Sequence, residues 1–180
     1  MSGKRAIVLL RAVNVGGTAK VPMADLRTLL GEIGYRDVAT YIQSGNIVAT
    51  VPSDRDDATI AAAIEAAIAE RMGVTTRAIV RTRDELDAAL AVYPYLDHEP
   101  KLAHILFFDH EPDPEGVAAL QERDFGDDEW QIVGRDMFVK YGENVHASKL
   151  ANATIERLLK VTSTGRNLKT VRKLIEMAEN

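Results

Sequence analysis

The stretch DVATYIQSGNIVATV, residues 37–51, decides the fold. It contains two segments rich in strand-forming residues, 37–43 and 47–51, separated only by Ser44, Gly45 and Asn46. So short a connection joins antiparallel strands, and a glycine within it accepts the positive φ of a tight turn. The sequence therefore predicts a β-hairpin at this point.

The sequence on each side of the hairpin predicts one helix and one strand. Before it, residues 5–10 form a short apolar run typical of a buried strand, and Pro22 suits the first position of a helix over residues 22–30. After it, residues 56–72 repeat isoleucine every four residues, as one face of a helix does, and residues 76–81 form another strand. The order β-α-β-β-α-β is the split β-α-β pattern of ferredoxin-like folds, in which both helices cover one face of an antiparallel sheet.

A second unit follows this pattern. Thr82 and Glu85 form a capping box that begins a helix, and we expect the chain to divide after it, into residues 1–96 and 97–180. In the second unit, the sequence predicts a strand at 103–108, a helix at 113–123, a hairpin over 130–140 turning at Gly134, and two terminal helices at 149–161 and 168–178. We find no internal repeat. The expected fold class is α+β, with a ferredoxin-like N-terminal unit and a smaller α/β C-terminal unit that ends in two helices.

Composition excludes several classes of protein. The 180 residues include 22 lysines and arginines and 27 aspartates and glutamates, which gives a formal net charge of −5. The absence of cysteine excludes disulfide scaffolds, thiolate zinc sites and cysteine nucleophiles. No apolar run approaches the roughly 20 residues of a membrane span, so we expect a soluble cytoplasmic protein with no membrane partner. A pI near 5.4 provides no global attraction to nucleic acid.

Several motifs resemble the DUF1697 family. They are LLRAVNVGG at residues 9–17, VPM at 21–23, YIQSGN at 41–46, SKL at 148–150 and TGRN at 164–167. The resemblance implies an α+β protein with a ferredoxin-like N-terminal half and a smaller α/β C-terminal half, but the family carries no established activity. Two positions depart from its pattern: Ala12 replaces the usual glycine, and Leu168 replaces a tryptophan that commonly follows Arg-Asn. If that tryptophan lines a ligand pocket, this chain would bind a different ligand or bind it more weakly.

The loop after the first strand is a candidate anion site. It carries Arg11, Asn14, Gly16, Gly17 and Lys20 between a strand and the start of a helix. Glycines allow backbone N–H groups to approach a phosphate or carboxylate, and arginine binds such groups through two hydrogen bonds. The glycine spacing matches neither the Walker A motif nor a dinucleotide fingerprint. The alternative is an ordinary turn shaped by the glycines, with both cations in solvent.

The hairpin turn should lie beside this loop. On their own, Ser44, Gly45 and Asn46 indicate only a turn. In a ferredoxin-like sheet, however, the first and third strands are central antiparallel neighbours, so the end of one lies near the start of the other. We therefore expect the side chains of Arg11, Asn14, Ser44 and Asn46 to converge at one edge of the sheet.

The second unit offers three further candidates. Lys149 follows Ser148, a candidate helix cap, and its charge would oppose the dipole of that helix. Arg166 and Asn167 precede the last helix, which Asn167 is suited to cap. Our hypothesis is that a cleft separates the units. Across it, Arg11 and Asn14 face Lys149, Arg166 and Asn167, and together they bind a small phosphorylated or carboxylated molecule.

Other functions have less support. No two of the four histidines have the i, i+4 spacing of a metal site, so the sequence indicates neither a metal nor a cofactor. Ferredoxin-like sheets bind RNA through aromatic residues on their central strands, and residues 5–10 and 47–51 contain none, so RNA ranks well below a small ligand. A homodimer or another interaction formed through an exposed sheet edge remains the alternative.

The sequence leaves open whether the protein is an enzyme. Ser44 lacks the Gly-x-Ser-x-Gly elbow of a serine nucleophile. In an enzyme, Arg11, Lys149 and Arg166 would stabilise negative charge rather than act as nucleophiles or bases. No catalytic residue is assigned.

Overall fold

Two units make up the chain. The computed structural model describes residues 2–179. The first unit consists of the residues up to Asp87 together with those from Lys173 onward, and the second is Ala88–Arg172. This division comes earlier than the expected boundary at residue 97, and it returns the C-terminal segment to the first unit.

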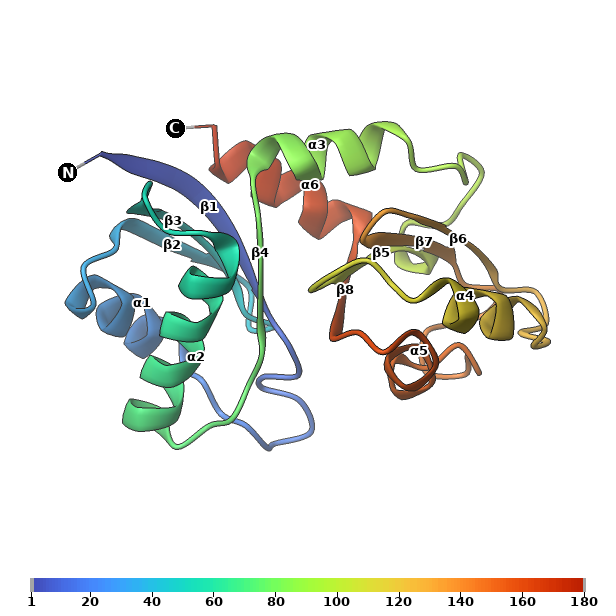
Figure 1. The fold of residues 1–180 in the computed structure, drawn as a ribbon, viewed down its shortest axis with the longest axis horizontal. Coiled ribbons are helices and arrows are strands. Elements are labelled where there is room, and N and C mark those ends of the chain that lie inside the picture. The colour runs from blue at the N-terminus through green and yellow to red at the C-terminus, as the bar shows by residue number, and fades with distance from the viewer. Residues whose placement is uncertain (1, 180) are drawn as a thin grey trace. The chain divides into compact units, whose positions relative to one another are not determined.

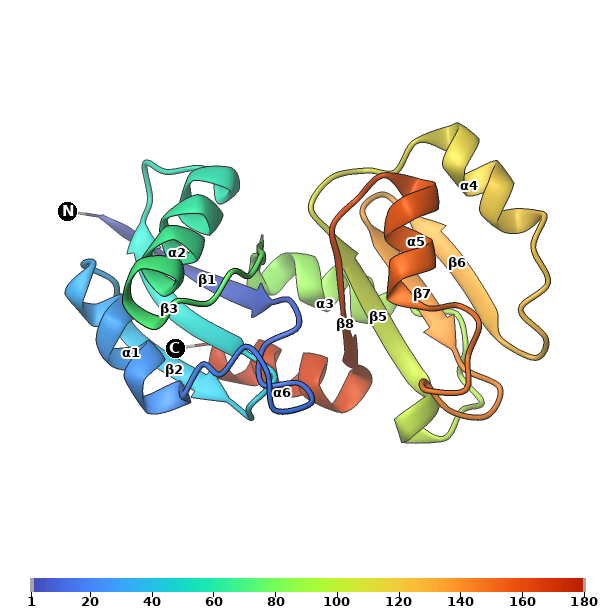
Figure 2. The ribbon, with the colours of Figure 1, turned by 90° about the horizontal axis from the view of Figure 1, so that it is seen from below.

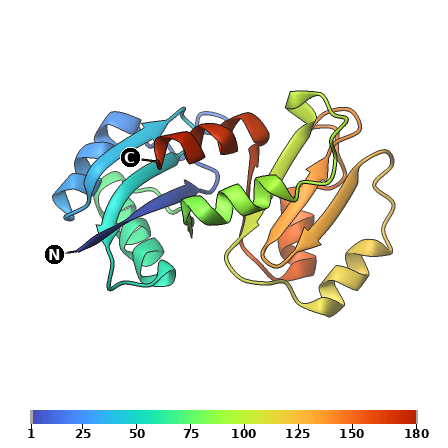
Figure 3. The same ribbon diagram turned by 90° about the horizontal axis from the view of Figure 1, so that it is seen from above.

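The first unit has the predicted ferredoxin-like topology (Figure 1). Its elements are β1 (Gly3–Leu10), α1 (Met23–Glu32), β2 (Arg36–Tyr41), β3 (Asn46–Pro52), α2 (Asp57–Met72) and β4 (Ala78–Arg81). The strand order is β2-β3-β1-β4, with every neighbouring pair antiparallel. Helices α1 and α2 lie on one face of this sheet (Figure 3), where alternate residues of β1, Ala6, Val8 and Leu10, are buried in a core cluster with Leu26 and Ile64.

The ends of the helices follow from local sequence. Asp56 caps α2 by accepting a hydrogen bond from Thr59 N at 2.8 Å, and Gly73 ends the helix with φ +65°. The capping box is also present before α3 (Arg83–Ala91): Thr82 Oγ1 accepts from Glu85 N at 3.1 Å, and Glu85 Oε2 accepts from Thr82 N at 2.7 Å. Pro22 differs slightly from the prediction, since it is the N-cap of α1 rather than its first residue.

Two sets of contacts explain where the units divide. Tyr93, just beyond α3, donates its hydroxyl to Val139 O at 2.7 Å, so the chain has already joined the second unit before the expected boundary. The last helix returns to the first unit: Arg5 Nη2 donates to Met177 O at 3.5 Å, and Arg83 forms an ion pair with Glu179 at 3.1 Å.

The second unit repeats the topology of the first. A short 3-10 turn, Pro100–Leu102, precedes β5 (Ala103–Phe108), α4 (Pro114–Gln121), β6 (Glu129–Val133), β7 (Asp136–Lys140), α5 (Asn152–Leu159) and β8 (Ser163–Asn167), and α6 (Leu168–Met177) follows. The order β6-β7-β5-β8, all antiparallel, is the counterpart of β2-β3-β1-β4. Helices α4 and α5 share a core with β5 and β7, which contains Leu106, Val139, Leu120 and Ile155. The fold is thus duplicated, although the sequence shows no repeat.

Strand β8 was not predicted, because its sequence STGRN has no apolar run. It forms by pairing its backbone with β5, with Gly165 opposite Leu106. A Cβ on Gly165 would lie 3.4 Å from the Leu106 side chain, which is an ordinary van der Waals contact. Polar side chains of this strand, Ser163, Thr164 and Arg166, are buried.

Helix α5 is shorter than the prediction of 149–161 and begins at Asn152, with Ala151 as its N-cap. Ser148 therefore does not cap it. Among residues 2–179, no helix combines the length and the apolar character that crossing a membrane requires.

Candidate functional site

The end of β1 lies beside the β2–β3 turn, as the ferredoxin-like order predicts (Figure 2). Leu9 is paired with Asn46, and Leu10 N donates to Gly45 O at 2.9 Å. The loop that follows, residues 11–21, therefore starts next to the turn. These two segments are called the first loop and the hairpin turn (residues 42–45) below.

Asn14 ties the first loop to the hairpin turn. Its Nδ2 donates to Gln43 O at 2.7 Å and to Val21 O at 2.9 Å, while its Oδ1 accepts from Val21 N at 2.8 Å. The whole side-chain amide is thus bonded to backbone groups, and Asn14 holds the loop closed at its base. In a binding site formed by the first loop, Asn14 is a positioning residue.

The backbone at the hairpin turn is shaped by Ser44, Gly45 and Asn46, the last of which begins β3. Asn46 is fully buried, and its Nδ2 donates to Tyr41 O and Ser44 Oγ, both at 2.9 Å. Gly45 has φ +87°, and a Cβ there would lie 2.8 Å from Leu10 Cβ and from Val13 Cγ2. The turn is therefore packed directly against the residues that begin the first loop.

The first loop concentrates left-handed backbone conformations, which are unfavourable at its two alanines. Ala12, Asn14 and Ala19 have φ of +55°, +55° and +49°, and Gly16 and Gly17 have +60° and +77°. An alanine in the left-handed region costs about 1–2 kcal/mol, which a glycine avoids. A glycine would take the φ of Ala12 without this strain.

The surface of the first loop is glycine-rich and cationic. Gly16, Gly17 and Lys20 are exposed, and a Cβ on either glycine would meet nothing within 4 Å. Arg11 is half-buried, and its backbone is fixed on both sides: its N donates to Arg77 O at 2.9 Å, and its O accepts from Thr76 Oγ1 at 2.8 Å. The loop thus presents two cationic residues and two unobstructed glycines from an anchored base.

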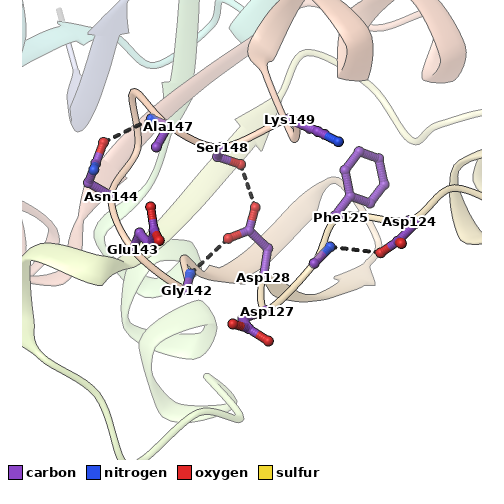
Figure 4. A pocket seen from close by; sticks show the side chains of 11 residues that line it. Asp124, Phe125, Asp127, Asp128, Gly142, Glu143, Asn144, Ala147, Ser148 and Lys149 are labelled. Atoms are coloured by element: carbon purple, nitrogen blue, oxygen red, sulfur yellow. Dashed lines mark hydrogen bonds between the residues drawn. The ribbon is translucent and has the colours of Figure 1, made fainter.

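Lys149 has a different setting from the expected one. It lines a hollow of about 290 Å³ in the second unit with Phe125 and the carboxylates Asp124, Asp127, Asp128 and Glu143 (Figure 4). Asp128 accepts from Gly142 N at 2.7 Å and from Ser148 Oγ at 2.5 Å, which holds the two sides of the hollow together. Because α5 begins only at Asn152, Lys149 lies outside that helix, and the charges around it are acidic. In the described part of the chain, no group of three His, Cys, Asp or Glu side chains could hold a metal ion.

Arg166 and Asn167 form hydrogen bonds within the second unit. Arg166 is 7% exposed, and its Nη1 donates to Thr164 Oγ1 at 2.8 Å and to Gly165 O at 2.9 Å. Burial lowers the pKa of Arg166 to about 10. Asn167 Oδ1 accepts from Thr170 N at 2.9 Å, which confirms the predicted cap of α6.

Two features of the structure were missed from the sequence. Arg81, 2% exposed, occupies the position in β4 that Arg166 occupies in β8, immediately before a helix-capping residue. Recognising the duplication would have revealed this pair. Ile42 and Val15, on the hairpin turn and the first loop, are 50% and 60% exposed.

Comparison with known proteins agrees with this fold. A solved structure described as a conserved bacterial protein from Streptococcus pneumoniae is similar to this chain with a TM-score of 0.73 and 27% sequence identity, over 99% of this chain and 100% of that one. No curated protein matches. The family described as "Protein of unknown function (DUF1697)" matches residues 4–138, about three quarters of the sequence. The chain therefore belongs to the DUF1697 family.

Proposed function

We propose that the first loop binds a small anion, a phosphate or carboxylate group, through Arg11, Lys20 and the backbone of Gly16 and Gly17. The observation that carries this proposal is the strained conformation of an exposed loop. Strained backbone persists where the surrounding structure enforces it, and it is common at ligand-binding sites. Here Asn14 and the hairpin turn enforce it.

The chemistry of the loop suits negative charge. Gly16 and Gly17 leave space for an oxyanion to approach the backbone, and their φ values suit a turn that gathers N–H groups. A guanidinium binds such a group through two parallel hydrogen bonds, and a lysine adds a mobile charge. These groups hold and stabilise negative charge but supply no nucleophile or base, so the proposal is one of binding.

The proposal confines the site to the first unit. Arg166 and Asn167 have hydrogen-bond partners within the second unit, and Lys149 lies among carboxylates. Their surroundings give no support to an anion site that includes them. Asn14, Ser44, Gly45 and Asn46 contribute by shaping the loop and the turn.

The other two functions have no comparable observation. On the face of the first sheet opposite α1 and α2, Ile7, Leu9 and Val48 are aliphatic and fully buried, which does not support base stacking on this surface. Pairing with a second copy would use the edge strand β2 or β4, and light scattering would measure it.

Isothermal titration with inorganic phosphate and with acetate tests the proposal. We expect saturable binding by the full chain, reduced at least tenfold by Arg11→Ala and by Lys20→Ala, because charge-assisted hydrogen bonds contribute about 1.5–3 kcal/mol. Arg27→Ala is the matched control, since Arg27 is an exposed arginine of the same unit, on α1. Absence of binding by the wild type, or equal loss in all three variants, would refute the proposed site.

A further inference from the structure

We infer that the ligand is an organic anion with an apolar group next to its charge, and that Ile42 and Val15 contact that apolar group. This inference rests on the proposed anion site and names the class of molecule that it takes. A phosphate monoester with an aromatic or short aliphatic substituent has the required chemistry.

Ile42 is the first observation. It lies in the hairpin turn with φ +49° and is 50% exposed. A β-branched residue in the left-handed region is a genuine conformational outlier, since its side chain crowds the backbone. Asparagine or glycine would take this conformation with little strain. The isoleucine thus strains the turn, and half of its apolar surface gains nothing from burial.

Val15 is the second observation, from the other segment. It is 60% exposed in the first loop and forms an isolated bridge with Thr18. The hydrogen bond from Asn14 Nδ2 to Gln43 O, 2.7 Å long, joins the residue before Val15 to the residue after Ile42. The two aliphatic residues therefore flank one short cross-link between the loop and the turn.

The first loop and the hairpin turn bonded to it carry both charged residues and exposed aliphatic residues. The same loop carries Arg11, Lys20 and the two exposed glycines. An inorganic anion would use only the polar groups. Contact with both aliphatic side chains requires a ligand whose carbon skeleton begins at the charged group, and that contact would account for the retention of a strained, exposed isoleucine.

Titrations of wild type, Ile42→Asn and Val15→Ser with inorganic phosphate and with phenyl phosphate test the inference. Val133→Ser is the control, because Val133 is also 50% exposed but lies in the second unit. Removing about 50 Å² of apolar surface from water corresponds to about tenfold in affinity, so wild type should prefer phenyl phosphate by about that factor. Ile42→Asn should abolish most of the preference for phenyl phosphate over inorganic phosphate, and Val15→Ser should reduce that preference. Because asparagine tolerates positive φ, Ile42→Asn should not lower the melting temperature.

The outcomes separate this inference from the proposed site. Equal preference in wild type and Ile42→Asn, together with phosphate binding that depends on Arg11, would overturn the inference and leave the anion site standing. Failure of wild type to bind either compound would overturn both. A loss of preference in Val133→Ser as large as that in Ile42→Asn would also overturn the inference.

Discussion

Replacement of Gly45 by alanine measures how tightly the hairpin turn is packed against the first loop. With φ +87°, an alanine at this position costs about 1–2 kcal/mol in backbone strain. Its Cβ would lie 2.8 Å from Leu10 Cβ and Val13 Cγ2, and both neighbours are buried, so neither moves away easily. Overpacking of this kind adds about 1–3 kcal/mol. The expected loss in the free energy of unfolding is therefore about 2–5 kcal/mol.

Gly17→Ala is the matched control. Gly17 has φ +77°, but a methyl group added there would meet nothing within 4 Å, so only the strain of about 1–2 kcal/mol applies. Urea denaturation of both variants, compared at equal slope, gives the difference directly. Gly45→Ala should be the less stable by about 1–3 kcal/mol. Equal stability of the two variants would refute the packing of the turn against Leu10 and Val13.

Three further changes test other parts of the structure. Ala12→Gly should raise the free energy of unfolding by about 0.5–1 kcal/mol, because relief of the strain at φ +55° outweighs the greater freedom of glycine in the unfolded chain. A variant that is less stable than wild type in urea would contradict the positive φ of Ala12. Burial lowers the pKa of His104 from 6.5, so below pH 6.5 the unfolded chain binds more protons than the folded chain, and the free energy of unfolding falls with falling pH. Urea titrations from pH 5 to pH 8 should show that the free energy of unfolding depends less on pH in His104→Gln than in wild type. The same pH dependence in both proteins would contradict the burial of His104. Asn167→Ala should lower the free energy of unfolding, measured in urea, by about 1 kcal/mol, whereas Asn167→Asp should retain the cap of α6 and its stability. Equal stability of these two variants would exclude the cap.

Much of the first unit was predictable because its sequence and its structure agree at each level. The hairpin spacing at Ser44-Gly45-Asn46, the isoleucine repeat of α2 and the capping box at Thr82 and Glu85 all correspond to features of the structure. The position of the first loop beside the hairpin turn followed from strand order alone, which the pairing of Leu9 with Asn46 confirms.

The second unit was less predictable because β8 depends on tertiary pairing. A strand of sequence STGRN buries hydroxyls and a guanidinium, and the hydrogen bond from Arg166 to Thr164 forms only in the folded unit. Without β8, the duplicated topology could not be recognised. The expected helix from Lys149 failed for a local reason, since Ser148 is bonded to Asp128 and Leu150 instead of capping a helix.

The strain in the candidate site was also invisible in the sequence. Alanine and isoleucine rarely adopt positive φ, so residue type gave no reason to expect it at Ala12 or Ile42. The surrounding contacts impose it, chiefly the three hydrogen bonds of the Asn14 side chain. Sequence patterns indicated where the loop lies, and the conformation that makes it a candidate site depends on packing.

Amide chemical shifts of the full chain during titration with phenyl phosphate test the anion site most directly. We expect saturable shifts concentrated in residues 11–20 and 41–46, which disappear in Arg11→Ala and persist in Arg27→Ala. Saturable shifts centred on the hollow around Lys149, or an Arg11→Ala protein that responds as the wild type does, would contradict the site.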